Sequence, residues 1–170
     1  MPKANNYTVI RDSREREGYY FSKFDNCNGM VVQKLDTGDY TIQGLEDKIC
    51  VERKGCIEEV AINLGKKKKQ FLAEIERMKE FPHRFILLEF SLDDLMKFPE
   101  GTRIPNTANL KITGKYILRC LMEFQVNDNV HVVFCGNKDN AFIYTHRLFK
   151  RINERYPNRP VTEREDDWWK

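Results

Sequence analysis

The 170-residue sequence lacks any apolar run near the eighteen or so residues needed to span a bilayer, and its start does not resemble a secretion signal. Cysteines are few, at five, and no two have C-x-x-C spacing. This argues against a zinc knuckle and against a disulfide framework. We therefore expect a cytoplasmic protein with reduced thiols and no membrane partner.

A strong excess of one charge is also missing. Lys and Arg number 29 and Asp and Glu 26, so the net charge is only +3. This balance does not indicate a nucleic-acid partner, but it allows one where basic residues cluster. The apolar fraction of 41% is typical of a globular chain. We expect one domain over residues 1–156 and a polar, mobile tail over residues 157–170.

The first third of the chain has the pattern of short strands. Runs of strand-forming residues bounded by Gly and Asp turns predict strands over Tyr7–Arg11, Met30–Leu35, Tyr40–Gln43 and Ile49–Lys54. Strands that follow one another so closely predict an antiparallel meander.

The rest of the chain alternates between helical and extended patterns. The expected elements are helices over residues 57–64 and 71–78, a central strand over 85–90, a short helix after Ser91, a loop over 99–109, a helix over 113–124, a buried strand over 130–135 and a helix over 139–156. The predicted fold class is α/β, with a mixed central β-sheet flanked by helices on both faces.

Asp39 and the run Glu52-Arg53-Lys54 carry the clearest chemistry. On a strand, Glu52 and Lys54 share one face and Arg53 points to the other. A turn from Asp39 into the neighbouring strand brings a second carboxylate beside Glu52. Two carboxylates and water suit Mg²⁺, and a nearby lysine can orient a water molecule, help remove its proton or offset charge on phosphorus.

The spacing of Glu52 and Lys54 has another interpretation. By itself, E-x-K is more often a solvated strand end with surface ion pairs, and Glu46-Asp47-Lys48 has the same spacing. The trio alone therefore leaves both interpretations open.

Three motifs in order favour the catalytic interpretation. D-S-R-E begins at Asp12, G-D-Y at Gly38 and V-E-R-K at Val51, each after an expected strand. This set resembles the nuclease domain of the XPF family of structure-selective DNA endonucleases, within the restriction-endonuclease-like PD-(D/E)XK superfamily. The resemblance extends from about Tyr7 to Tyr156.

The resemblance implies roles at the matching positions. Asp39 and Glu52 would bind Mg²⁺ or Mn²⁺, with the backbone carbonyl of Arg53 nearby, and Lys54 would be the catalytic lysine. Asp12 would be a further acidic residue near the metal.

The remaining motif residues would serve the substrate. Arg14 would contact a phosphate and Glu15 would orient Arg14. Family members often carry an Asp in the helix after E-R-K. Glu58 and Glu59 both fall close to that position, and we assign Glu58.

A four-lysine run, Lys66, Lys67, Lys68 and Lys69, opens the next expected helix. Cations oppose the dipole at a helix N-terminus, so a nearby DNA phosphate would explain them. A solvated helix start explains them equally well. Gln70 and Arg77 extend the same face toward the expected DNA surface.

The function expected from these residues is that of a metal-dependent DNA endonuclease for branched DNA, such as flaps and splayed arms, or single-stranded DNA, with a place in DNA repair or recombination. The alternatives are a non-catalytic DNA-binding or scaffolding subunit, and a nuclease for RNA. The sequence shows no helix-hairpin-helix region like that of larger family members, which suggests a stand-alone bacterial or phage protein associated with the nucleoid. A homodimer through residues 113–124 or 139–156 is plausible by the resemblance.

Overall fold

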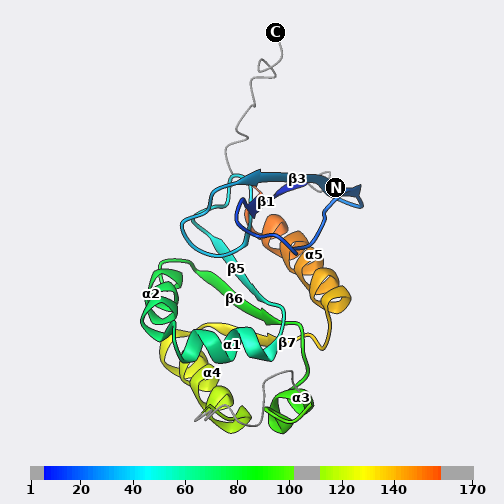
Figure 1. Ribbon diagram of the computed structural model, residues 1–170. Helices are drawn as coiled ribbons and strands as arrows, with labels where there is room; N and C mark the ends of the chain where they lie inside the picture. Colours follow the sequence, from blue (N-terminus) through cyan, green and yellow to red (C-terminus); the bar gives the residue numbers. More distant parts are fainter. Residues whose placement is uncertain (1–5, 102–111, 158–170) are drawn as a thin grey trace.

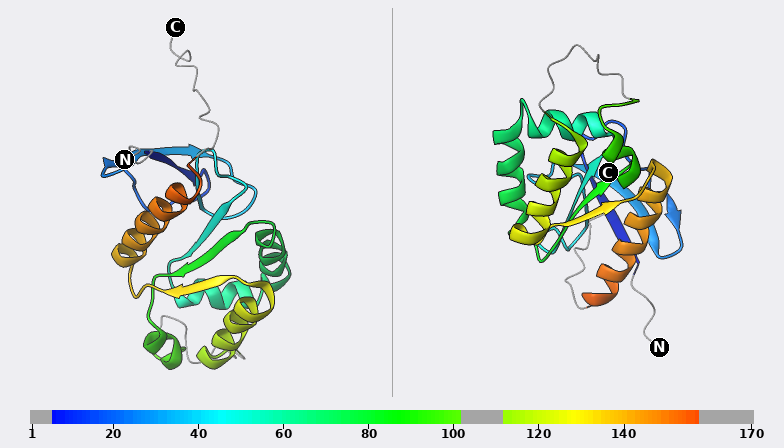
Figure 2. Two further views of the ribbon diagram at one scale, coloured as in Figure 1. Left: turned by 180° about the vertical axis from the view of Figure 1, so that it is seen from behind. Right: turned by 90° about the horizontal axis from the view of Figure 1, so that it is seen from below.

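The computed structural model of the chain describes residues 6–101 and 112–157, and within them one sheet lies between two helical layers (Figures 1 and 2). The elements are β1 (Tyr7–Asp12), β2 (Lys23–Phe24), β3 (Cys27–Gln33), β4 (Tyr40–Ile42), β5 (Ile49–Lys54), α1 (Ile57–Leu64), α2 (Lys68–Met78), β6 (His83–Leu88), α3 (Leu92–Lys97), α4 (Gly114–Asp128), β7 (His131–Phe134) and α5 (Lys138–Arg155). Helices cover both faces of a mixed sheet, so the predicted fold class is confirmed.

The order of the strands differs from the predicted meander. The sheet runs β2-β3-β1-β4-β5-β6-β7, with β1 parallel to β3 and antiparallel to β4. The meander was wrong at its start, because the chain leaves β1 through a long loop and the short hairpin β2–β3, which returns β3 on the outer side of β1. Its antiparallel pair of β4 and β5 is confirmed. The two-residue strand β2 has too few residues to give a sequence pattern.

Strands β5 and β6 are buried on both faces, and their side chains alternate between two cores. Cys50, Ile86 and Leu88 pack with α1, α2, α3 and α4. Val51 and Leu87 pack with α5 on the other side. The same alternation carries Glu52 and Lys54 toward the first core and Arg53 toward the second.

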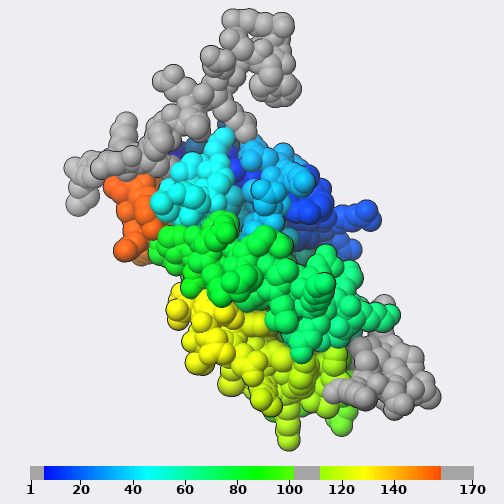
Figure 3. All heavy atoms as spheres, turned by 90° about the vertical axis from the view of Figure 1, so that its left-hand side faces the viewer, coloured from blue at the N-terminus to red at the C-terminus, as the bar shows by residue number. Residues whose placement is uncertain are grey.

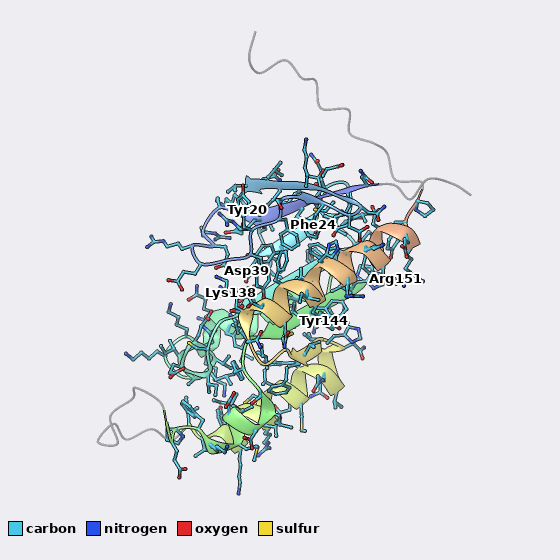
Figure 4. All side chains as sticks on the ribbon, turned by 90° about the vertical axis from the view of Figure 1, so that its right-hand side faces the viewer. Tyr20, Phe24, Asp39, Lys138, Tyr144 and Arg151 are labelled. Atoms are coloured by element: carbon cyan, nitrogen blue, oxygen red, sulfur yellow. The ribbon has the colours of Figure 1, made fainter. Side chains whose placement is uncertain are left out.

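Several strand ends meet along one side of the sheet, which is the edge formed by strand ends and not by an outer strand. The C-terminal ends of β1, β5 and β6 lie there with the N-terminal end of β4, because β4 is antiparallel to both β1 and β5. Asp12, Asp39, Lys54 and Glu89 therefore come to the same edge. Figure 4 shows Asp39 and the start of α5, at Lys138, toward the same side of the molecule.

The last predicted strand is not buried as expected. β7 forms one edge of the sheet, and its residues are half-buried or exposed because β6 is its one partner in the sheet. The short helix predicted after Ser91 is α3, and Ser91 caps it by accepting a hydrogen bond from the Asp94 N–H.

Two predicted segments fall largely beyond the described residues: most of the loop over 99–109, and all of the tail after residue 157. All five cysteines are free. None of the helices within residues 6–101 and 112–157 has the length and hydropathy to cross a bilayer.

Candidate active site

Glu52 and Lys54 form an ion pair near the end of β5. Lys54 Nζ donates to Glu52 Oε1 at 2.9 Å. Lys54 is only 4% exposed and Glu52 only 6%. Lys54 Nζ also lies 4.8 Å from the centre of the Phe71 ring on α2. A solvated strand end with surface ion pairs is therefore the wrong interpretation of this spacing.

Asp39 reaches the same strand end from the turn before β4. Its Oδ2 accepts a hydrogen bond from the Arg53 N–H at 2.7 Å, and its own N–H donates to the Val51 carbonyl at 2.8 Å. Gly38 has a φ of +78°, and a Cβ there would lie 2.6 Å from Cys50 Sγ. Only glycine fits this close turn, which carries Asp39 to the predicted place beside Glu52.

A polar cavity of about 340 Å³ opens beside this group of residues. Its lining brings together five carboxylates, two guanidinium groups, one amide and one glycine: Glu15, Asp36, Asp39, Glu59, Glu74, Arg14, Arg77, Gln70 and Gly38. The excess of carboxylates gives the cavity a negative potential that favours a cation.

Burial is the main cause that raises the pKa of both central carboxyl groups. Burial, and then the charges of Glu52 and Glu15, raise the pKa of Asp39. Burial raises the pKa of Glu52 to about 8, with Glu74 adding to the rise and Lys54 opposing it. Burial alone would lower the pKa of Lys54, but Glu52 and Glu74 raise it, so the lysine stays cationic.

The donor set fits Mg²⁺ or Mn²⁺ better than zinc. Asp39 and Glu52 are oxygen donors whose mutual repulsion a divalent cation would relieve, and Mg²⁺ commonly uses one or two carboxylates plus water. No group of three or more His, Cys, Asp or Glu side chains in the described part of the chain is arranged to hold a metal. A metal site here would therefore rest on two carboxylates, a backbone carbonyl and water.

Asp12 and Arg14 bind each other. Arg14 donates through Nε and Nη2 to the two carboxylate oxygens of Asp12, at 2.9 and 3.1 Å, and the Leu35 N–H donates to Asp12 at 2.7 Å. Although burial opposes it, these hydrogen bonds lower the pKa of Asp12. These contacts tie β1 to the residues after β3, and a role of Asp12 near the metal stays a prediction.

The structure brings Glu59, and not the predicted Glu58, to the cavity. Glu59, one residue later, lines the cavity, accepts from the Gly55 N–H at 3.0 Å and lies 3.9 Å from Lys54 Nζ. Glu58 does not line the cavity, since the helical register of α1 turns it away. The sequence left these two neighbours ambiguous by one residue.

Glu74 on α2 was missed by the sequence analysis. It lines the cavity and acts on the pKa of Glu52. Gln70, Glu74 and Arg77 are spaced i, i+4 and i+7 on one helical stripe, and the buried Phe71 and Ile75 lie on the next. That periodicity was the available signal.

The predicted DNA-binding residues divide into two groups. Arg14 and Arg77 line the cavity, and Arg77 Nε also donates to Thr37 at 3.3 Å. The four lysines of residues 66–69 are all exposed, at and before the start of α2. Lys68 Nζ donates to the Tyr116 hydroxyl at 3.1 Å. Contacts of this group with DNA stay a prediction.

Comparisons with known proteins give two results beyond this geometry. No curated protein matches the chain. Among solved structures, XPF from Aeropyrum pernix superposes with a TM-score of 0.61 at 16% identity, and the same protein in complex with DNA superposes with a TM-score of 0.60 at 16% identity. The alignments cover 87% and 88% of this chain and 66% of each XPF chain, which is just under two thirds.

The third comparison concerns families. The model of the ERCC4 domain matches residues 11–148, which include the D-x-R-E, G-D-Y and V-E-R-K motifs. This match spans far more than half of the chain, and the XPF fold agrees with it. The resemblance to the XPF family is thereby confirmed, and the chain belongs to the ERCC4 domain family.

Proposed function

We propose that this protein is a divalent-metal-dependent endonuclease that hydrolyses phosphodiester bonds in DNA. The observation that carries the proposal is the assembly of Asp39, Glu52 and Lys54 at one strand end beside an acidic cavity. The ERCC4 domain match and the likeness to an XPF in complex with DNA support it.

Each residue of the site has a task in this proposal. Asp39 and Glu52 would hold Mg²⁺ or Mn²⁺, together with the Arg53 carbonyl and water. The chemistry that the ion supplies when bound is Lewis acidity toward a phosphate oxygen and a water molecule. Lys54 is cationic and buried, so it would offset negative charge on the phosphate as the bond breaks. Glu59 would hold Lys54 in place.

The substrate would approach the cavity past its basic rim. Arg14 and Arg77 line the cavity, and the exposed lysines of residues 66–69 extend the positive surface along α2. Phosphate contacts of this kind fix the position of DNA without reading its sequence. We propose branched DNA, such as flaps or splayed arms, or single strands as the substrate, as for the XPF family.

The second candidate function is a non-catalytic DNA-binding or scaffolding subunit. A buried ion pair beside a second carboxylate costs folding free energy, and a non-catalytic scaffold would gain no function from it. The intact Asp39, Glu52 and Lys54 therefore favour catalysis. A nuclease acting on RNA would use the same site, because phosphate contacts do not report the sugar.

The test is cleavage of end-labelled flap, splayed-arm, single-stranded and duplex DNA, and of single-stranded RNA, with Mg²⁺ or Mn²⁺. We expect metal-dependent cutting by the wild type and a loss of about a thousandfold or more in Glu52→Gln, which keeps the size of the side chain but removes its charge. Tight binding without cutting by the wild type on every substrate would favour the scaffold. Equal cutting by wild type and variant would contradict the mechanism.

We also propose that two copies associate through α4. This helix lies on the surface of the molecule (Figure 3, yellow-green). An apolar depression of about 410 Å³ runs along it, and Met122 and Val126 in the depression are 51% and 78% exposed. Lys115 and Arg119 lie toward the start of the helix and Glu123 toward its end, so two antiparallel copies would have opposite charges facing. The mass in solution, measured by light scattering, distinguishes a dimer from a monomer.

A further inference from the structure

A polar network centred on Arg53 lies on the face of the sheet opposite Glu52 and Lys54, and it reaches the active-site cavity through Glu15. Arg53 donates through Nε and Nη2 to both carboxylate oxygens of Glu89, at 2.6 and 2.8 Å, and through Nη1 to Glu15 at 3.2 Å. The side chains of Arg53, Glu89 and Glu15 are only 10%, 4% and 13% exposed. The bidentate pair fixes the guanidinium plane, because both N–H vectors must match one carboxylate.

Tyr19 closes the network. Its hydroxyl donates to Glu89 at 3.2 Å, and its ring lies 5.6 Å from the Arg53 guanidinium carbon. The N–H of Tyr19 donates to the Tyr40 hydroxyl at 2.6 Å, and the two rings stack with centres 5.1 Å apart. The loop before β2 is therefore anchored against the same arginine, on the side of the sheet covered by α5 (Figure 4).

The backbone of Arg53 connects this network to the active site. Its N–H is the donor to Asp39 at 2.7 Å, and its sequence neighbours are Glu52 and Lys54. Glu89 is tied to the same strand a second time, because its N–H donates to the Lys54 carbonyl at 3.0 Å. A rotation of the strand end that loosened Arg53 would thus displace all three residues of the proposed catalytic group.

We propose that Glu89 is a positioning residue that acts through Arg53 to hold Asp39, Glu52 and Lys54 in their working arrangement. The proposal rests on the proposed nuclease function. Stability alone does not account for the network, since a buried ion pair is often no more stabilising than well-packed apolar residues of the same volume. A geometric role does account for it, because supporting residues that orient a reactive group need fixed, directional contacts.

The test variant is Glu89→Gln, which keeps the shape of the side chain and removes its charge. We expect kcat to fall by about tenfold or more, as for other supporting residues, and the metal concentration for half-maximal activity to rise. KM for DNA stays near the wild-type value, because Glu89 lies on the face away from the cavity. Glu89→Asp keeps the charge but shortens the reach, so a smaller fall in kcat is expected. Glu89→Asp also replaces Glu89→Gln as the test variant if Glu89→Gln does not fold.

Thr41→Val is the matched control. Thr41 is buried in β4 and donates to the Ile49 carbonyl at 2.7 Å, at the opposite end of β5 from the site. This variant loses one buried hydrogen bond to β5, from β4 instead of from the end of β6. We expect it to lower Tm while leaving kcat unchanged. A fall in kcat in Thr41→Val as large as that in Glu89→Gln would overturn the positioning role.

A second measurement does not depend on cleavage. Hydrogen exchange of the Arg53 amide, followed by NMR, reports the bond to Asp39 directly. We expect faster exchange in Glu89→Gln than in Thr41→Val, after correction for global stability. Wild-type protection of this amide in Glu89→Gln would overturn the proposal. If the wild type cuts no substrate, the nuclease function fails, and the exchange rates still decide whether Glu89 positions the strand end.

Discussion

The two faces of β5 differ in how their charges are balanced. On the face toward α1 and α2, Glu52 and Lys54 pair beside a cavity lined by five carboxylates, of which Glu15 also reaches Arg53. On the face toward α5, the Arg53 guanidinium meets two carboxylates and the Tyr19 ring in a network with little exposure. One face holds unbalanced negative charge next to open space, and the other satisfies its donors and acceptors internally.

This difference separates two tasks along one strand. Burial, with the charges of neighbouring carboxylates added to it, raises the pKa of Asp39 and of Glu52, and this lowers stability unless a cation or a substrate enters. The paired face has no such need, and its directional hydrogen bonds fix the backbone from which the reactive side chains extend. Alternation along β5 places the two tasks back to back.

The largest effect on stability is expected from breaking the network around Arg53, on the face of β5 toward α5 (the paired face). Arg53→Met leaves Glu89 and Glu15 buried without their cation, and removal of one partner from a buried pair costs about 3 to 5 kcal/mol. The double variant Glu52→Gln/Lys54→Met instead removes both charges from the open face. Its free energy of unfolding is expected to stay the same or rise. Urea denaturation followed by circular dichroism measures both values.

Equal losses of stability in these two variants would contradict the comparison. A loss confined to the double variant would reverse it, and would mean that the ion pair beside the cavity holds the strand end. Both variants are expected to lose cleavage, so stability and not activity separates the faces.

A smaller effect, on kcat, is expected from the face of β5 toward α1 and α2, beside the cavity (the open face). Glu59→Gln is expected to lower kcat by about tenfold, because Glu59 lies near Lys54 Nζ and accepts from the Gly55 N–H. Glu58→Gln is the matched control in the adjacent position of α1, and its kcat is expected to match the wild type. Cleavage assays at saturating metal compare the two. A larger loss in Glu58→Gln would restore the register that the sequence suggested.

The sequence predicted the open face better than the paired one. Asp39, Glu52 and Lys54 lie in short motifs whose spacing on strands determines which side chains meet, and the structure brings them together. Arg53 was expected only to point away. Its partner Glu89 is 36 residues distant, at the end of β6, and no local pattern indicates which strand will lie beside β5.

The same limit explains the errors in the fold. Periodicity predicted most strands and helices, but the place of β1 between β3 and β4 depends on a loop and a two-residue strand. The sequence did not show which of Glu58 and Glu59 faces the cavity for a related reason. A helix turns by about 100° per residue, so an error of one residue changes which side chain faces the site.

The smallest expected effect is a change in the pH dependence of stability. It comes from His146, at the outer part of the face covered by α5. His146 on α5 hydrogen-bonds the Tyr7 hydroxyl and lies 3.6 Å from Asp25. Burial lowers the pKa of His146 from 6.5, and Asp25 offsets this only in part. The unfolded chain therefore binds more protons below about pH 6.5, so this contribution to stability is present above that pH and is lost as the pH falls through the lower, folded-state pKa.

The variant His146→Gln tests this contribution. We expect its free energy of unfolding to fall less than that of the wild type between pH 7 and pH 5, measured by urea denaturation at both values. Part of the fall remains, because burial lowers the pKa of His83 in the same direction. An unchanged pH dependence would mean that Asp25 stabilises protonated His146 enough to cancel the cost of burial. The α5 face would then be charge-paired at its periphery as well as at Arg53.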